Sequence, residues 1–184
     1  MPSEQHAERA LGIGILGTGH ISTQFALALR ESGSRTVRIA AVASRDGARA
    51  AALAQLCGAR GSYADYGALL ADDDVEAVYI GLPNSLHAEW TVRAAVAGRH
   101  VLCEKPLALS LAEAGRMVDA CERNEVLLME AFPYQFQPQT IEMCRCVAAG
   151  EIGTVRVLQA TTGFPLTAAD NSRLQPELGG GALL

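Results

Sequence analysis

The chain has 184 residues, 49% of them hydrophobic and 19% charged, so a substantial core is possible and disorder is not expected. Its net charge of −5 comes from interspersed acidic and basic residues, which argues against nucleic-acid and membrane-surface partners. The polar start, 1–10, lacks the apolar segment of a secretory signal, so we expect a cytoplasmic protein. The five cysteines include no C-x-x-C pair, so we expect reduced thiols and no metal site.

The stretch 11–22 is the first that suggests a ligand. A short apolar run meets two glycines, and a helical pattern follows, which is the order in which a helix N-terminus holds a pyrophosphate. Gly17 would allow the tight turn, and Gly19 would let phosphate oxygens approach the backbone. Ser22 stands where the dinucleotide-binding fingerprint, G-x-G-x-x-G, has its third glycine, and it is another small residue. Glycine also occurs in ordinary turns, so neighbouring residues must decide between these interpretations.

From 11 to about 130 the pattern predicts alternating strands and helices. The predicted strands are 11–16, 37–43, a short one near 62, 77–82, 100–103 and 126–129. The predicted helices are 20–31, 47–56 after Asp46 as N-cap, a short one to 70 after Asp65, 85–97, and 111–123 opened by Ser110 with Glu113. This is an α/β fold, a Rossmann-type doubly wound parallel sheet in 11–130, preceded by a polar tail, 1–10. The acidic turn 72–74 is interpreted as a solvated connection rather than a metal site.

After residue 130 the composition changes. The segment 132–138 is aromatic and interrupted by prolines, and a helix over 139–149, a strand over 155–162 and a glycine-rich end follow. One helix and one strand cannot form an independent core. We therefore expect 131–184 to be the incomplete start of an α+β substrate and dimerisation domain.

In an open parallel sheet, ligands bind beyond the carboxyl ends of the strands. Four groups of residues fall at such ends and are the candidate cofactor contacts: Gly17, Thr18, Gly19, His20 and Ile21; Ser44, Arg45 and Arg49; Leu82, Pro83, Asn84 and His87; Glu104 and Lys105. Their convergence favours a dinucleotide site over a simple turn.

The end of the second strand discriminates between cofactors. An acidic residue there would bind a free ribose 2′-OH, whereas Ser44 and Arg45, with Arg49 one turn later, suit a 2′-phosphate. The sequence therefore favours NADP, with NAD still possible. The alternative is that Arg45 is an ordinary surface arginine.

Lys105 is the best candidate for catalysis. It follows a buried strand and precedes a proline, and a lysine in a partly desolvated site can exchange a proton with a substrate hydroxyl. Glu104 should project to the opposite side. An exposed Glu–Lys pair before a loop is the alternative. His87 could orient a ligand or be solvated, and Tyr134 could line a substrate pocket or pack between domains.

The chain resembles the glucose–fructose oxidoreductase / inositol dehydrogenase / MocA (Gfo/Idh/MocA) family, and is similar to its branch of NADP-dependent dihydrodiol and D-xylose dehydrogenases. The resemblance rests on Gly14-Ile-Leu-Gly17-Thr-Gly19-His-Ile21, Ser44-Arg45, Pro83-Asn84-Ser-Leu-His87, Cys-Glu104-Lys105-Pro106, Glu130-Ala-Phe-Pro-Tyr134 and the closing Gly-Gly-Gly-Ala-Leu-Leu.

This resemblance implies hydride transfer between nicotinamide and a carbon of a sugar, polyol or diol, with Lys105 exchanging the hydroxyl proton. It also implies a homo-oligomer for a full-length protein. Two features depart from the family: Gln135 and Gln137 stand where relatives often carry Arg and His, and the Asp-x-x-x-His-like segment expected beyond 184 is missing, so the chain alone should be inactive or weakly active. The alternatives are a nucleotide-sensing regulator without catalysis and a free-standing nucleotide-binding module.

Overall fold

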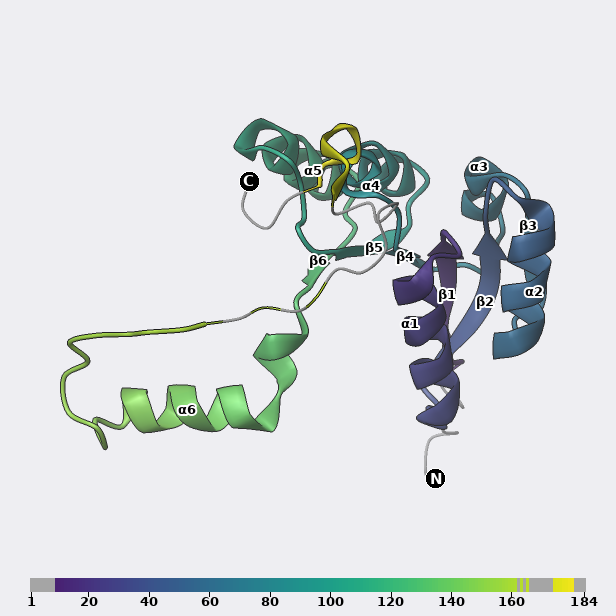
Figure 1. The fold of residues 1–184 in the computed structure, drawn as a ribbon. Helices are drawn as coiled ribbons and strands as arrows, with labels where there is room; N and C mark the ends of the chain where they lie inside the picture. Colours follow the sequence, from purple (N-terminus) through teal and green to yellow (C-terminus); the bar gives the residue numbers. More distant parts are fainter. Residues whose placement is uncertain (1–8, 162, 164, 166–173, 181–184) are drawn as a thin grey trace, which may run out of the picture.

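The centre of the molecule is a six-stranded parallel sheet of order β3-β2-β1-β4-β5-β6 (Figure 1). The computed structural model describes residues 9–161, 163, 165 and 174–180. The chain order reverses between β1 and β4, which pair in parallel, so the topological switch point lies at their carboxyl ends. The predicted doubly wound sheet is thus confirmed, with strands β1 (Leu11–Leu16), β2 (Val37–Ala43), β3 (Gly61–Tyr63), β4 (Ala77–Ile80), β5 (His100–Glu104) and β6 (Leu128–Ala131).

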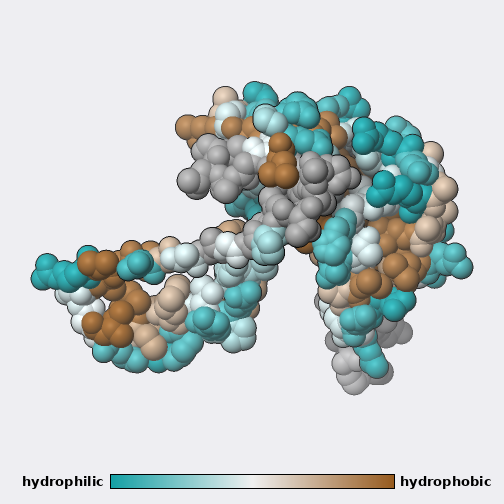
Figure 2. Space-filling view, in the orientation of Figure 1, coloured by the Kyte–Doolittle hydropathy of each residue, from teal (hydrophilic) through white to brown (hydrophobic). Residues whose placement is uncertain are grey.

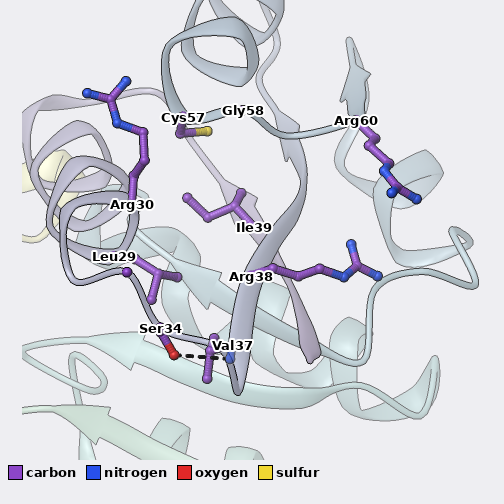
Figure 3. Close-up of a pocket in the computed structure, with 10 residues that line it drawn as sticks. Leu29, Arg30, Ser34, Val37, Arg38, Ile39, Cys57, Gly58 and Arg60 are labelled. Atoms are coloured by element: carbon purple, nitrogen blue, oxygen red, sulfur yellow. Dashed lines mark hydrogen bonds between the residues drawn. The ribbon is translucent and has the colours of Figure 1, made fainter. Parts of the chain in front are cut away.

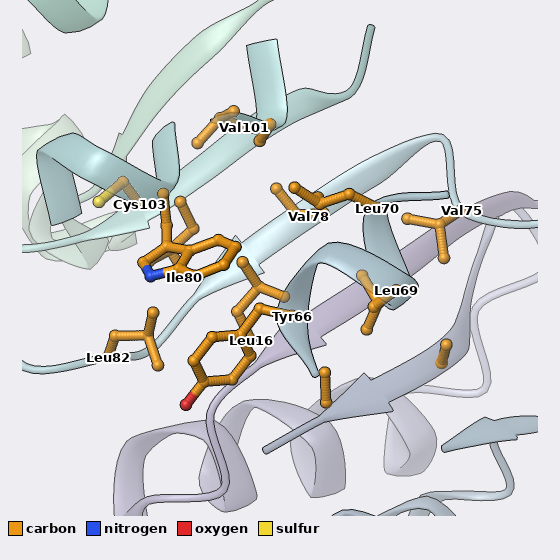
Figure 4. Packing of buried hydrophobic residues seen from close by; sticks show 14 of the residues in the cluster. Leu16, Tyr66, Leu69, Leu70, Val75, Val78, Ile80, Leu82, Val101 and Cys103 are labelled. Carbon is orange, nitrogen blue, oxygen red and sulfur yellow. The ribbon is translucent and has the colours of Figure 1, made fainter. Parts of the chain in front are cut away.

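Helices cover both faces of the sheet, so successive strand residues enter different cores. Ile15 packs with α1 and α2 on one face, whereas the next residue, Leu16, packs with α3, α4 and α5 on the other. Figure 4 shows this second cluster, to which Tyr66 and Leu69 of α3 and Ile80 of β4 belong. The helices are α1 (His20–Glu31), α2 (Gly47–Cys57), α3 (Tyr66–Leu70), α4 (His87–Val96) and α5 (Leu111–Arg123).

The predicted helix caps are confirmed. Asp46 accepts hydrogen bonds from the first-turn N–H groups of Ala48 and Arg49, at 3.0 and 3.2 Å. Asp65 accepts one at 2.8 Å from α3, and Ser110 accepts one at 3.2 Å from Glu113 in α5. Each cap satisfies N–H groups that would otherwise lack an intrahelical partner.

Several predicted boundaries differ from the structure. β4 ends at Ile80 rather than 82, and a 3-10 turn, η1 (Asn84–Leu86), precedes α4 in the predicted helix 85–97. β6 begins at Leu128 rather than 126, because the N–H of Val126 donates to Cys121 O at 3.0 Å and still belongs to the turn after α5.

The acidic turn 72–74 is engaged with its surroundings. Asp72 accepts the hydroxyl of Tyr63 at 3.0 Å and the N–H of Asp74 at 2.9 Å, and Asp74 pairs with Arg38 at 2.8 Å. These carboxylates therefore have protein partners and fix the connection from α3 to β4.

Beyond β6 the chain leaves the sheet. η2 (Pro133–Phe136) and α6 (Pro138–Ala148) project from it together with the extended segment that follows (Figure 1). The predicted strand is not formed over 155–161, where Val157 and Leu158 are each 82% exposed; residue 162 lies outside the described residues. A strand needs a partner for its backbone groups, and the described chain supplies none there. Figure 2 shows apolar surface along this projection.

The end of the described chain returns to the sheet. η4 (Pro176–Leu178) lies against η1, and Gly179, with a φ of +76°, packs between the side chains of Asn84 and Leu109. None of the described helices combines the length and apolar character needed to cross a membrane.

Candidate functional site

The glycine loop occupies the carboxyl end of β1, where the sequence places it. The N–H of Gly17 donates to Ala43 O at 2.9 Å, which ties the loop to the end of β2. Gly17 has a φ of +98°, and a Cβ there would lie 3.0 Å from Gly81 O and from Leu82 Cδ2, so this position requires glycine. Gly19 begins α1 with no side-chain cap, and a Cβ on it would meet no atom within 4 Å. An uncapped helix start beside open space can bind a phosphate.

Ser22 brings α1 close to the end of β4. It is fully buried, and its hydroxyl donates to Gly81 O at 3.4 Å. A Cβ on Gly81 would lie only 2.2 Å from Ser22 Oγ, so neither residue has room to grow. The small residue thus permits close contact between α1 and the end of β4. His20 and Ile21 on the same turn are exposed, at the mouth of the site.

A polar corner lies at the end of β2. The hydroxyl of Thr18 donates to Ser44 Oγ at 3.2 Å, and Arg49 Nη2 donates to Thr18 O at 3.0 Å. Ser44 Oγ also accepts the N–H of Asp46 at 3.2 Å, and Asp46 itself caps α2. Two hydroxyls and the guanidinium of Arg49 therefore meet beside the glycine loop, with the exposed Arg45 next to them in the chain. This set of donors suits a phosphate rather than a free ribose hydroxyl.

Glu104 and Lys105 differ in how they are held. Glu104 Oε1 accepts the hydroxyl of Tyr79 at 2.9 Å, and Oε2 accepts the N–H of Lys105 at 3.2 Å. Tyr79 stacks on Phe25 with ring centroids 4.0 Å apart, and burial together with the Glu104 carboxylate raises the pKa of the Tyr79 hydroxyl. Glu104 is thus anchored toward α1, whereas Lys105 is exposed. The Lys105–Pro106 bond is cis.

The loop after β4 is held from within the protein. His87 is fully buried, with Nδ1 2.8 Å from Pro106 O and Nε2 3.0 Å from Leu82 O. It is therefore neither solvated nor free to touch a ligand, which corrects its assignment as a direct cofactor contact. The side-chain amide of Asn84, a candidate cofactor contact, donates to Gly179 O at 2.7 Å. In this structure Asn84 is therefore bonded to the segment that returns to the sheet. Pro83, between Leu82 and Asn84 in the chain, is half-buried.

Tyr134 lies in η2, 54% exposed, with its ring 5.5 Å from that of Phe132. The structure thus pairs it with another aromatic residue of the projecting segment. Two residues that the sequence reading missed, Tyr79 and Glu130, hold the loop that carries Lys105; Glu130 Oε1 accepts the N–H of Leu107 at 2.9 Å. A buried tyrosine hydroxyl needs a partner, and that requirement was the available signal for Tyr79.

A groove of about 310 Å³ lies at the opposite end of β2 (Figure 3). Arg30 there donates to Leu56 O, and Arg38 is paired with Asp74. Figure 3 shows the guanidinium groups of Arg30, Arg38 and Arg60 pointing in different directions, so they form no common anion site. The groove borders the amino end of β2, whereas ligands of such sheets bind at the carboxyl ends.

Comparisons with known proteins agree with this geometry. Residues 11–132 match the family described as "Oxidoreductase family, NAD-binding Rossmann fold". The chain is 45% identical over 172 residues to D-xylose 1-dehydrogenase (NADP(+)) 2 of Haloferax volcanii, covering 93% of this chain and 52% of that protein. It thus spans about half the length of the curated relatives that it matches.

Solved structures show the same likeness. A 3-ketoreductase from Actinomadura kijaniata in complex with NADP superposes with a TM-score of 0.72 at 36% identity, covering 78% of this chain and 45% of the other. An aldose–aldose oxidoreductase from Caulobacter crescentus, complexed with glycerol, gives a TM-score of 0.84 at 33% identity and covers 92% and 52%.

Proposed function

The chain belongs to the Gfo/Idh/MocA family of oxidoreductases, and we propose that it binds NADP at the carboxyl edge of its sheet and serves hydride transfer to or from a small sugar, polyol or diol. The observation that carries the cofactor assignment is the polar corner of Thr18, Ser44 and Arg49 beside the uncapped start of α1. A pyrophosphate would lie at 17–21, and a 2′-phosphate at Ser44, Arg45 and Arg49.

The cofactor supplies a nicotinamide that accepts or donates hydride. The protein would supply the proton transfer, which we assign to the amine of Lys105. In the oxidative direction the neutral amine would take the proton of a substrate hydroxyl, and in the reductive direction the ammonium would return it. Glu104 accepts hydrogen bonds from Tyr79 and from the Lys105 backbone, so it would position the lysine rather than exchange this proton.

A regulator that senses the nucleotide without catalysis is the second candidate. It would need the glycine loop and the polar corner but would have no use for an exposed lysine beside the site. Lys105 at the end of β5 therefore favours the enzyme. A cytoplasmic location and homo-oligomerisation remain predictions from the sequence.

Cofactor titration tests the first part of the proposal. NADPH should bind at least about tenfold more tightly than NADH, measured by nicotinamide fluorescence, because a charge-assisted hydrogen bond contributes about 1.5–3 kcal/mol. Arg45→Gln should weaken NADPH binding while leaving NADH unchanged, and Arg49→Gln, which also loses the bond to Thr18 O, should weaken NADPH binding by a larger factor than NADH binding. The matched control is Arg116→Gln, an exposed arginine on α5. Equal affinities, or a preference for NADH, would contradict the assignment.

Replacement of the lysine tests the second part. In a chain extended to the length of its relatives, Lys105→Ala should lower turnover by orders of magnitude and change NADPH affinity by less than about twofold. Turnover retained in that variant would remove Lys105 from the mechanism.

A further inference from the structure

His87 joins two loops that border the proposed site. It is the first residue of α4, its side chain is fully buried, and each ring nitrogen lies within hydrogen-bond distance of a backbone carbonyl. One carbonyl, of Leu82, belongs to the loop after β4, and the other, of Pro106, belongs to the loop after β5. The ring therefore bridges the ends of two adjacent strands.

Carbonyl oxygens only accept hydrogen bonds, so His87 is the donor in any hydrogen bond that its ring makes to either carbonyl. A neutral imidazole has one N–H to donate, and a protonated imidazole has two. In either form the ring fills the space between the two carbonyls. Its burial and its engaged nitrogens exclude direct contact with substrate, so its influence on the chemistry has to pass through the loops that it holds.

The loop after β5 is anchored at three successive residues. The N–H of Lys105 donates to Glu104, and the N–H of Leu107 donates to Glu130. Pro106, between them, has no N–H, so its carbonyl is the one backbone group by which the loop can be held at that point, and His87 holds it. The backbone that carries Lys105 is thus fixed from β5, α4 and β6, while the side chain stays exposed.

Leu82, the second residue that His87 contacts, lies beside the glycine loop. The side chain of Leu82 lies where a Cβ on Gly17 would meet it, 3.0 Å away, so the loop after β4 supports the turn after β1. We propose that His87 is a positioning residue that sets the distance between Lys105 and the cofactor loop through Pro106 and Leu82. This inference rests on the proposed function of Lys105.

Lys105 is the single lysine of the chain, which makes its position directly measurable. Reductive methylation with ¹³C-formaldehyde labels only this amine and the N-terminus, and NMR then reports the environment of each. In the wild-type chain the Lys105 resonance should differ from its position in urea and should move on addition of NADPH. His87→Leu should bring it toward the urea position and remove at least half of the NADPH-induced shift.

Conservative variants separate a positioning role from a merely structural one. His87→Asn keeps a donor near the Nδ1 position, so it should hold Pro106 and retain the wild-type Lys105 resonance; His87→Gln places its donor near Nε2, toward Leu82, and should displace that resonance. His100→Asn is the matched control, because His100 accepts the N–H of Leu127 at 3.0 Å at the opposite end of β5. If His87→Leu does not fold, the Asn and Gln variants carry the comparison.

The outcomes are distinguishable. A Lys105 resonance identical in wild type, His87→Gln and every folded His87 variant would overturn the positioning role. Failure of the wild-type chain to bind NADPH would overturn the proposed function instead, while the ligand-free spectra would still report on His87. The inference would be supported if the Lys105 resonance is displaced in His87→Gln but keeps its wild-type position in His87→Asn and His100→Asn.

Discussion

The contact between Ser22 and Gly81 allows a quantitative test of how the glycine loop is supported. In Gly81→Ala the new Cβ would lie 2.2 Å from Ser22 Oγ, closer than two non-bonded atoms can approach. Ser22 is fully buried, so relief requires movement of α1 or of the end of β4. In a Ser22→Ala background the obstructing oxygen is absent, and the nearest remaining atoms are Tyr79 Cε1 at 3.0 Å and the Cβ of residue 22 at 3.4 Å.

The expected energies follow from these distances. Overpacking a buried site costs about 1–3 kcal/mol, offset by about 0.4–1 kcal/mol because alanine restricts the unfolded chain. Gly81→Ala should therefore lower the free energy of unfolding by about 1–2 kcal/mol in the wild-type background. Ser22→Ala removes one long hydrogen bond and should cost about 0.5–1 kcal/mol. In the double variant most of the Gly81→Ala cost should disappear, which gives a coupling energy of about 1 kcal/mol or more.

Urea unfolding followed by the fluorescence of Trp90, the single tryptophan and buried in α4, measures all four chains. Gly115→Ala is the control, because a Cβ on this α5 glycine meets no atom within 4 Å and should stabilise the chain by about 0.5–1 kcal/mol. Additive effects of the Ser22 and Gly81 substitutions would refute the reasoning, since they would mean that the two side chains do not meet.

Three further perturbations test other parts of the structure. Asp46→Ala removes the acceptor for two N–H groups of α2 and should lower the free energy of unfolding, measured by urea unfolding, by about 1 kcal/mol. An unchanged midpoint of the urea transition would argue against the cap. Tyr79→Phe leaves a Glu104 oxygen without its donor and should cost about 1–3 kcal/mol in the same assay, whereas a neutral effect would mean that water replaces the hydroxyl. Burial raises the pKa of the Cys103 thiol from 9.0 to about 12, so the folded state retains a proton that the unfolded state loses. Stability should therefore fall between pH 9 and 12, by up to about 1.4 kcal/mol per pH unit, and Cys103→Ala should flatten that slope in unfolding measured against pH.

Local signals predicted most of the sheet unit. Asp46, Asp65 and Ser110 each precede a helix by one residue, and a cap needs only the backbone of the next turn, so the sequence contains all of its information. The apolar strands were recognisable for a similar reason, since a strand covered on both faces has no polar alternation to obscure it.

Features that depend on distant residues were not predictable in this way. The apolar segment 155–161 resembles a strand, but a strand forms only against another, and the described chain offers no neighbour there. His87 was predicted to be solvated or to orient a ligand. Its position in the first turn of a helix does not indicate that the Pro106 carbonyl, 19 residues away, contacts its ring.

The bond from Asn84 to Gly179 joins residues 95 positions apart, and the projecting helix α6 lies on the chain between them. The entropy of closing a loop grows only with the logarithm of its length, so doubling or halving this loop would change the free energy by only about 0.6 kcal/mol. Segments of very different size could therefore be inserted between β6 and Gly179 while the edge of the sheet keeps the same two anchoring points. The contact between Asn84 and Gly179 is therefore compatible with projecting segments of many different lengths.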